Sequence, residues 1–212
     1  KSNFYLAMDE LYLDLVGFCT ACPYTEMVGN RLHYQVWPIR EYVFTQGLDG
    51  RADAVYRDFK MTAAQVVARF RTHPGFKEFG ESVVRAMDAN AKLVDQQKQV
   101  RIVHAIYPRE NYDPRKKGPK NMPIASCYIN ADDKVIIAEG GYEEAPANVV
   151  RWRLTSDDDG WGRGPAHTAM PDIRSLNSLK RMWHRAAAKD LDPPHVVENK
   201  GVIGSVRVVQ NG

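Results

Sequence analysis

The chain has 212 residues, with 29 Lys and Arg against 26 Asp and Glu, and its net charge is +3. A net charge this small gives no global attraction to nucleic acid or to an anionic membrane. Any basic surface therefore has to be local. No apolar run approaches the roughly 20 residues needed to cross a bilayer, the first residues lack a signal-peptide pattern, and three cysteines do not suggest a disulfide framework. We expect a protein that works inside cells or in an assembly, with no membrane partner. Because the chain lacks an initiator Met, we also expect a piece of a longer protein.

Helical and strand-like periods follow one another along the first half of the chain. Apolar residues recur every three or four positions in the helical stretches, where Ser2 and Thr62 are the predicted N-caps, and every second position in the strands. The predicted elements are a helix at 2–18, a strand at 31–38, a strand pair at 41–61, and helices at 63–70 and 81–94.

The second half returns to strand patterns and then contains a long helix, in which Pro171 should cause a kink. The predicted elements are a strand at 100–109, a strand pair at 122–142, a strand at 148–155, a helix at 165–189 and a strand-like end at 192–212. The order of elements predicts an α+β fold, in which an antiparallel β-rich body with flanking helices is followed by one long helix that leaves it.

A glycine-rich stretch, "GWGRGP", joins the last predicted strand of the body to the long helix. A glycine loop before a helix can bind phosphate. This one lacks the Lys-Ser/Thr of a Walker loop, does not complete the G-x-G-x-x-G pattern, and follows three aspartates at 157–159. The spacing therefore favours a structural turn over a nucleotide site. The junction residues are Gly160, Gly162, Arg163, Gly164 and Pro165.

Cys19 and Cys22 have the C-x-x-C spacing of redox and zinc sites. A redox pair of the thioredoxin type opens a helix, whereas this pair follows one. A structural zinc site needs further ligands, which only Cys127 and scattered histidines such as His33 and His104 could supply. We predict two small buried residues, with a redox or zinc protein as the alternative. The pattern indicates no catalytic residue, cofactor or metal ion.

The predicted long helix is amphipathic, and it is basic and almost free of acidic residues after Asp172. Its apolar stripe consists of Ile173, Leu176, Leu179 or Lys180, Trp183 and Ala187. A charged helix face is commonly just solvated, but a DNA-binding module that uses residues 171–189 is a second alternative. The candidate DNA-contacting residues are Lys180, Arg181 and Arg185.

Several stretches together resemble one family, the head-tail connector (portal) proteins of short-tailed bacteriophages. The similar stretches are "SNFYLAMDELYLDLVGF", "VYRDFKMTAAQVVARF", "VRIVHAIYPRE", "KNMPIASCYI", "EGGYEEAPANVVRWR", "GWGRGPAHTAMPDIRSLNSLKR" and "AAAKDLDPPHVV". They occur in the family in this order and cover nearly the whole chain.

The resemblance implies a structural ring subunit rather than an enzyme. Such proteins assemble as about twelve copies around a channel at one capsid vertex of the virion, after synthesis in the host cytoplasm. Their partners are other copies of the same chain, the packaging terminase, tail or adaptor proteins, and capsid and scaffolding proteins. Double-stranded DNA passes through without sequence specificity.

Matched to the family's layout, residues 1–164 resemble the wing domain, 165–190 a stem helix, and 191–212 the start of the clip region. The glycine-arginine stretch resembles the family's wing-stem junction, where the chain turns sharply and begins a helix. The resemblance also implies that cations of the stem helix, here Lys180, Arg181 and Arg185, face the DNA channel.

Overall fold

The computed structural model describes residues 2–88, 97–113, 115, 118–154 and 160–193. Contacts divide the chain into two compact units, residues 1–166 and 167–212. The described residues of the first unit form two antiparallel sheets and the helices α1, α2 and α3, and helix α5 extends through the described part of the second. The predicted α+β class is confirmed.

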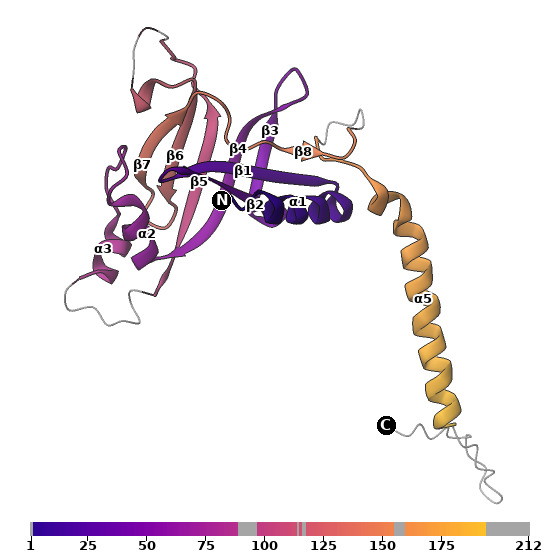
Figure 1. Cartoon of the computed structure of the whole chain (residues 1–212). Helices are drawn as coiled ribbons and strands as arrows, with labels where there is room; N and C mark the ends of the chain where they lie inside the picture. Colours follow the sequence, from indigo (N-terminus) through magenta and orange to yellow (C-terminus); the bar gives the residue numbers. More distant parts are fainter. Residues whose placement is uncertain (1, 89–96, 114, 116–117, 155–159, 194–212) are drawn as a thin grey trace, which may run out of the picture. The chain divides into compact units, whose positions relative to one another are not determined.

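The larger sheet of the first unit is antiparallel, and each strand pairs with the next one along the chain (Figure 1). Its strands are β3 (Tyr42–Gln46), β4 (Ala52–Thr62), β5 (Gln99–Pro108), β6 (Ile124–Asn130) and β7 (Val135–Tyr142). Their alternating patterns predicted all five strands. Single-turn helices η1 (Ile39–Glu41) and η2 (Pro119–Asn121) precede β3 and β6.

Helices α2 (Ala63–Phe70) and α3 (Glu81–Ala86) pack on the larger sheet. Val66, Phe70 and Val83 are fully buried there, in one cluster with apolar side chains of β5, β6 and β7. Removing large aliphatic and aromatic side chains from water is the main driving force for this packing.

The start of α2 is the predicted one. Thr62 Oγ1 accepts a hydrogen bond from the Gln65 amide, and the Gln65 side chain accepts one from the Thr62 amide, which makes a capping box. Helix α3 is shorter than predicted, because it ends at Ala86 rather than continuing from 81 to 94; residues 89–94 lie outside the described part of the chain.

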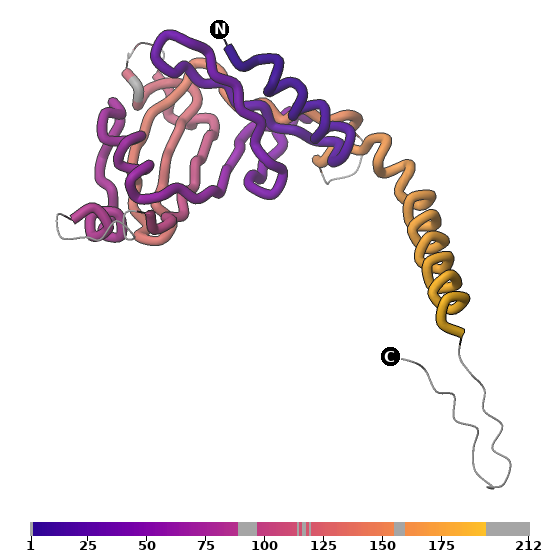
Figure 2. Tube along the Cα trace, turned by 60° about the horizontal axis from the view of Figure 1, so that its bottom comes forward, coloured from indigo at the N-terminus to yellow at the C-terminus, as the bar shows by residue number. Residues whose placement is uncertain are grey.

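The smaller sheet has the order β2-β1-β8, and helix α1 (Phe4–Phe18) runs alongside it (Figure 1, Figure 2). Its strands are β1 (Thr20–Val28), β2 (Arg31–Trp37) and β8 (Val150–Arg151). Strand β1 was not predicted, because its burial does not alternate and it contains Pro23. Strand β8 has two residues, so the strand predicted at 148–155 was too long.

The predicted N-cap of α1 is wrong. Asn3, not Ser2, occupies the cap position, and its side chain makes no cap hydrogen bond. Instead the Asn3 amide group donates to the Tyr34 carbonyl at 2.7 Å and accepts from the Tyr34 N–H at 2.9 Å. Asn3 therefore pairs with the outer edge of β2 as a strand would, and this contact joins the helix start to the sheet.

A cluster of buried aromatic and aliphatic side chains holds the two sheets together. Tyr24 of β1 stacks on Trp37 of β2 with ring centres 4.7 Å apart, and both pack against Tyr42, Val55 and Ile106 of the larger sheet. This cluster contains residues of both sheets, so the two sheets of the first unit share a buried core.

Helix α5 (Pro165–Leu191) continues through Pro171, so the proline does not end it, and the kink predicted there stays a prediction. None of its residues is buried. Within the described residues no helix combines the length and apolar character that crossing a membrane requires. The strand-like end predicted at 192–212 lies almost wholly outside the described part of the chain.

Candidate functional site

The glycine-arginine stretch at 160–165 follows β8, and Arg151 holds its first residue. Arg151 Nη1 donates to the Gly160 carbonyl at 3.0 Å, and Nη2 donates to the Gly50 carbonyl. The Arg151 guanidinium also lies 5.8 Å from the centre of the Phe44 ring. Gly160 has a φ of +64°, in the left-handed region where glycine is favoured. This glycine is therefore needed for the turn itself.

Gly162 and Gly164 are needed for a different reason, because they pack closely against the end of α1. A Cβ on Gly162 would lie 1.9 Å from the Cys19 carbonyl oxygen, and the Gly162 amide donates to Thr20 Oγ1 at 2.9 Å. A Cβ on Gly164 would lie 2.8 Å from Cys19 Sγ and 3.1 Å from Trp152 Cγ. Gly162 thus packs against backbone and Gly164 against two side chains, and this close packing, rather than a positive φ, accounts for both glycines.

Arg163 and Pro165 complete the junction. The Arg163 amide donates to the Arg153 carbonyl at 2.9 Å, and Pro165 is the first residue of α5, where a missing N–H costs little. The amides of Gly162 and Arg163 thus both donate within the protein, which leaves neither of them for a phosphate. The aspartates at 157–159 lie outside the described residues.

The C-x-x-C pair is part of this packing. Cys19 ends α1 in the left-handed conformation, Cys22 lies in β1, and both side chains are buried and outside any disulfide. Burial raises the pKa of the Cys22 thiol to about 12. Reactive thiols in redox proteins have a lowered pKa, so this environment is the opposite of a redox site.

The other residues considered as zinc ligands have different contacts. His104 Nε2 is hydrogen-bonded to Ser126 Oγ at 2.9 Å. His33 Nδ1 lies 3.9 Å from Glu26 Oε1, and Cys127 Sγ lies 3.8 Å from the Tyr107 hydroxyl. Among the residues that the structure describes, no group of three or more His, Cys, Asp or Glu side chains is arranged to hold a metal ion. The described residues therefore offer no ligand set for the zinc alternative.

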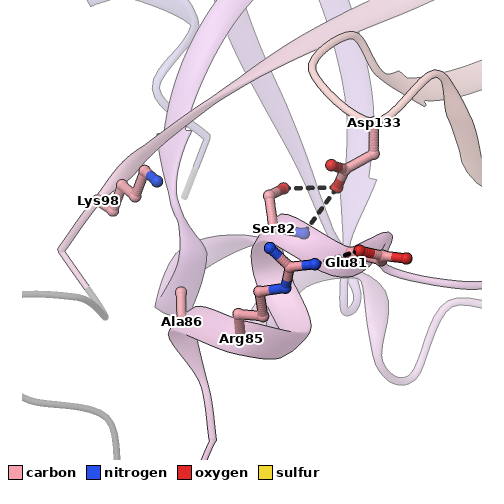
Figure 3. A pocket seen from close by; sticks show the side chains of 6 residues that line it. All are labelled: Glu81, Ser82, Arg85, Ala86, Lys98 and Asp133. Carbon is pink, nitrogen blue, oxygen red and sulfur yellow. Dashed lines mark hydrogen bonds and ion pairs between the residues drawn. The ribbon is translucent and has the colours of Figure 1, made fainter.

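A pocket lies where α3 meets the turn between β6 and β7 (Figure 3). Asp133 Oδ2 accepts hydrogen bonds from the Ser82 amide and hydroxyl, and Arg85 forms an ion pair with Glu81. These contacts hold the start of a short helix, so we interpret the pocket as structural.

The predicted DNA-contacting residues are exposed on α5, but they do not share one side of the helix. Successive residues of an α-helix are offset by about 100°. Arg181 and Arg185 therefore lie within about 40° of each other, with Arg174 between them, whereas Lys180 is about 100° from Arg181. Sequence reasoning had not included Arg174, although its spacing of seven residues from Arg181 identifies it. We call Arg174, Arg181 and Arg185 the arginine face.

The opposite side of α5 is apolar and exposed. Its large side chains are at least 44% exposed, and Trp183 reaches 68%. Lys180 lies within this side, between Leu176 one turn before it and Trp183 one turn after it. We call it the α5 stripe, which consists of Ile173, Leu176, Leu179, Met182 and Trp183.

Comparison with known proteins gives the family. The sequence pattern of the family described as "Bacteriophage head to tail connecting protein" matches residues 1–212. The chain is 30% identical over 200 residues to the "Probable portal protein" of Bordetella phage BPP-1, and 27% identical over 199 residues to the "Portal protein" of Salmonella phage epsilon15. Each alignment covers 92% of this chain and 34% of the relative, so the chain spans about a third of the length of these curated relatives. The resemblance noted in the sequence is thus confirmed over the whole chain, and the protein belongs to the family of bacteriophage head-to-tail connecting proteins.

Proposed function

We propose that the chain is part of the structural subunit of a ring-shaped portal, which forms the channel through which double-stranded DNA is packaged and ejected. The observation that carries this proposal is the family match over residues 1–212, with relatives named as portal proteins. The ring contains about twelve copies at the capsid vertex of the virion and is made in the host cytoplasm. It meets the packaging terminase, tail or adaptor proteins, and capsid and scaffolding proteins. Its role is structural, not enzymatic.

The division of the chain follows from the same proposal. Residues 1–164 are the wing domain, 165–190 the stem helix, and 191–212 the start of the clip region. The compact first unit, which ends at residue 166, supports the first boundary, and the exposed helix α5 supports the second. Gly160 to Pro165 are the wing-stem junction, where close backbone packing fixes the start of the helix.

The arginine face of α5 gives the channel its affinity for DNA. Duplex DNA carries about one negative charge per 1.7 Å of its axis, so cations repeated around a ring hold it through many weak contacts. Contacts to phosphates carry no sequence information, and they allow the DNA to slide. Arg181 and Arg185 keep the role expected for them and Arg174 joins them, whereas Lys180 lies on the other side of the helix.

Electron microscopy of the full-length protein tests the proposal. We expect closed rings with a central hole, and a protein that remains monomeric or forms open filaments would contradict it. Affinity for unrelated DNA duplexes should be equal and should fall steeply as salt rises. A strong preference for one duplex would instead favour the sequence-specific DNA-binding module.

A further inference from the structure

Helix α1 has an exposed apolar side that the first unit leaves uncovered. Its buried side consists of Ala7, Leu11 and Leu15, which pack on the smaller sheet. Large side chains on the other side are between 52% and 87% exposed. We call this side the α1 stripe, which consists of Tyr5, Leu6, Tyr12, Leu13 and Val16.

The α1 stripe has one acidic residue at its centre. Asp9 is exposed, and it lies one turn from Tyr5 on one side and from Tyr12 and Leu13 on the other. Helix α1 contains two further acidic residues, Glu10 and Asp14, and no Lys or Arg. Partial burial, with repulsion from Glu10 added to it, raises the pKa of Asp14. The whole helix therefore presents negative charge around an apolar surface.

The α5 stripe is the counterpart with the opposite charge. Lys180 lies within it, between Ile173 and Leu176 around the helix, and α5 carries five Lys and Arg against two Asp. Neither Asp9 nor Lys180 forms an ion pair with another described residue. The two stripes also match in length, because residues 5–16 of α1 and residues 173–183 of α5 each span about 16 Å of helix.

We propose that the α1 stripe of one copy packs against the α5 stripe of a neighbouring copy, with Asp9 paired to Lys180 across the contact. Large apolar stripes that stay exposed in a single chain commonly mark interaction surfaces. A stripe packed on its own copy would bring Asp9 to Asp9 or Lys180 to Lys180, and such like-charge contacts are unfavourable. The pairing of unlike stripes removes both repulsions.

The type of contact also fits the proposed function, on which this inference rests. A patch that packs against itself produces a dimer and stops there, whereas contact between two different patches repeats from copy to copy and can close a ring. The inference further explains why Lys180 lies apart from the arginine face. With the α5 stripe turned to a neighbour, the opposite side with Arg174, Arg181 and Arg185 stays free for DNA.

Cross-linking between copies tests the contact directly. Full-length protein with Asp9→Cys is mixed during assembly with full-length protein carrying Lys180→Cys, and a short bis-maleimide is added. We expect a cross-linked dimer of the two variants. Ser178→Cys, exposed on the other side of α5, replaces Lys180→Cys as the matched control and should give no dimer above the background of each variant alone. A mixture of Asp9→Cys and Lys180→Cys that gives no more dimer than this control overturns the inference.

Charge reversal tests the pairing of Asp9 with Lys180. Asp9→Lys or Lys180→Asp alone should raise the protein concentration needed for half-maximal ring formation by about tenfold, measured by sedimentation velocity of the full-length protein. The double variant should return close to the wild-type value, and Ser178→Asp should match wild type. A double variant no better than the worse single variant overturns the pairing.

Wild-type protein separates this inference from the proposed function. If it stays monomeric, both fail. If it forms a ring but the cross-linked dimer does not exceed the control and the double charge reversal does not restore assembly, the portal role stands. Only the contact between α1 and α5 is then wrong.

Discussion

Gly162 illustrates how a single residue can determine where the chain leaves its domain. Its Cα lies against the carbonyl of Cys19, which also accepts a hydrogen bond from the Trp152 amide. Three segments distant in the sequence thus meet at one carbonyl group: the end of α1, the residue that follows β8, and the glycine-arginine stretch. Any side chain at position 162 has to displace backbone rather than a flexible side chain.

Replacing Gly162 with Ala should lower the free energy of unfolding by about 3 kcal/mol or more, because overpacking against backbone cannot be relieved by a rotamer change. Denaturant unfolding of the protein measures the change. Gly17→Ala is the matched control, since nothing lies within 4 Å of a Cβ built at that exposed helical glycine. Alanine favours helix, so Gly17→Ala should be neutral or stabilising. Equal stability of Gly162→Ala and wild type would show that the close packing is not required.

At the scale of elements, strands β5 and β6 bury a polar group between the two sheets. The His104 ring stacks on Tyr128 with centres 3.9 Å apart, and its Nε2 is 2.9 Å from Ser126 Oγ. Burial, with the positive charges of Arg69 and Arg57 added to it, holds the pKa of His104 well below 6.5. His104 therefore stays neutral in the folded protein.

The lowered pKa of His104 makes the free energy of unfolding depend on pH. Below pH 6.5 His104 binds a proton in the unfolded chain but not in the folded one, so stability is complete above this pH and is lost as the pH falls towards the folded pKa. The contribution of His104 to the slope approaches about 1.4 kcal/mol per pH unit. His104→Gln should flatten the dependence between about pH 6.5 and 5, measured by urea unfolding.

The exposed His33 provides the matched control for His104. His33→Gln should keep the wild-type slope over the same pH range. A slope that His104→Gln leaves unchanged would contradict the assignment of this pH dependence to β5.

At the scale of the whole molecule, the arginine face predicts how a full-length ring handles DNA. Changing Arg174, Arg181 and Arg185 to Gln should leave the ring assembled, because exposed charges contribute little to stability. DNA packaged per capsid, and DNA retained afterwards, should both fall several-fold at low salt. The difference from wild type should shrink as salt shortens the Debye length to about 3 Å at 1 M.

Three exposed cations of the first unit, Arg31, Arg40 and Lys60, provide the matched control. Their combined change to Gln removes the same charge from each copy and should leave packaging at the wild-type level. If the arginine-face variant packages and retains DNA as wild type does at every salt concentration, these cations face away from the channel and the portal role is unaffected.

Local patterns in the sequence were sufficient for much of this protein. The strands of the larger sheet, helix α2 with its cap at Thr62, and the long amphipathic α5 all follow from periodicity and capping, which depend on neighbouring residues. The order of the quoted stretches was likewise sufficient for the family, which the match over residues 1–212 confirms.

Only the tertiary structure decided the features that depend on contacts between distant segments. Strand β1 lacks alternation because its first residues are buried on both sides by α1, β8 and the glycine-arginine stretch. Asn3 pairs with Tyr34 instead of capping its helix, and the glycines at 162 and 164 are required by Cys19, more than 140 residues earlier in the chain. A local pattern carries no information about which distant backbone approaches a residue, so these contacts could be found only in the folded chain.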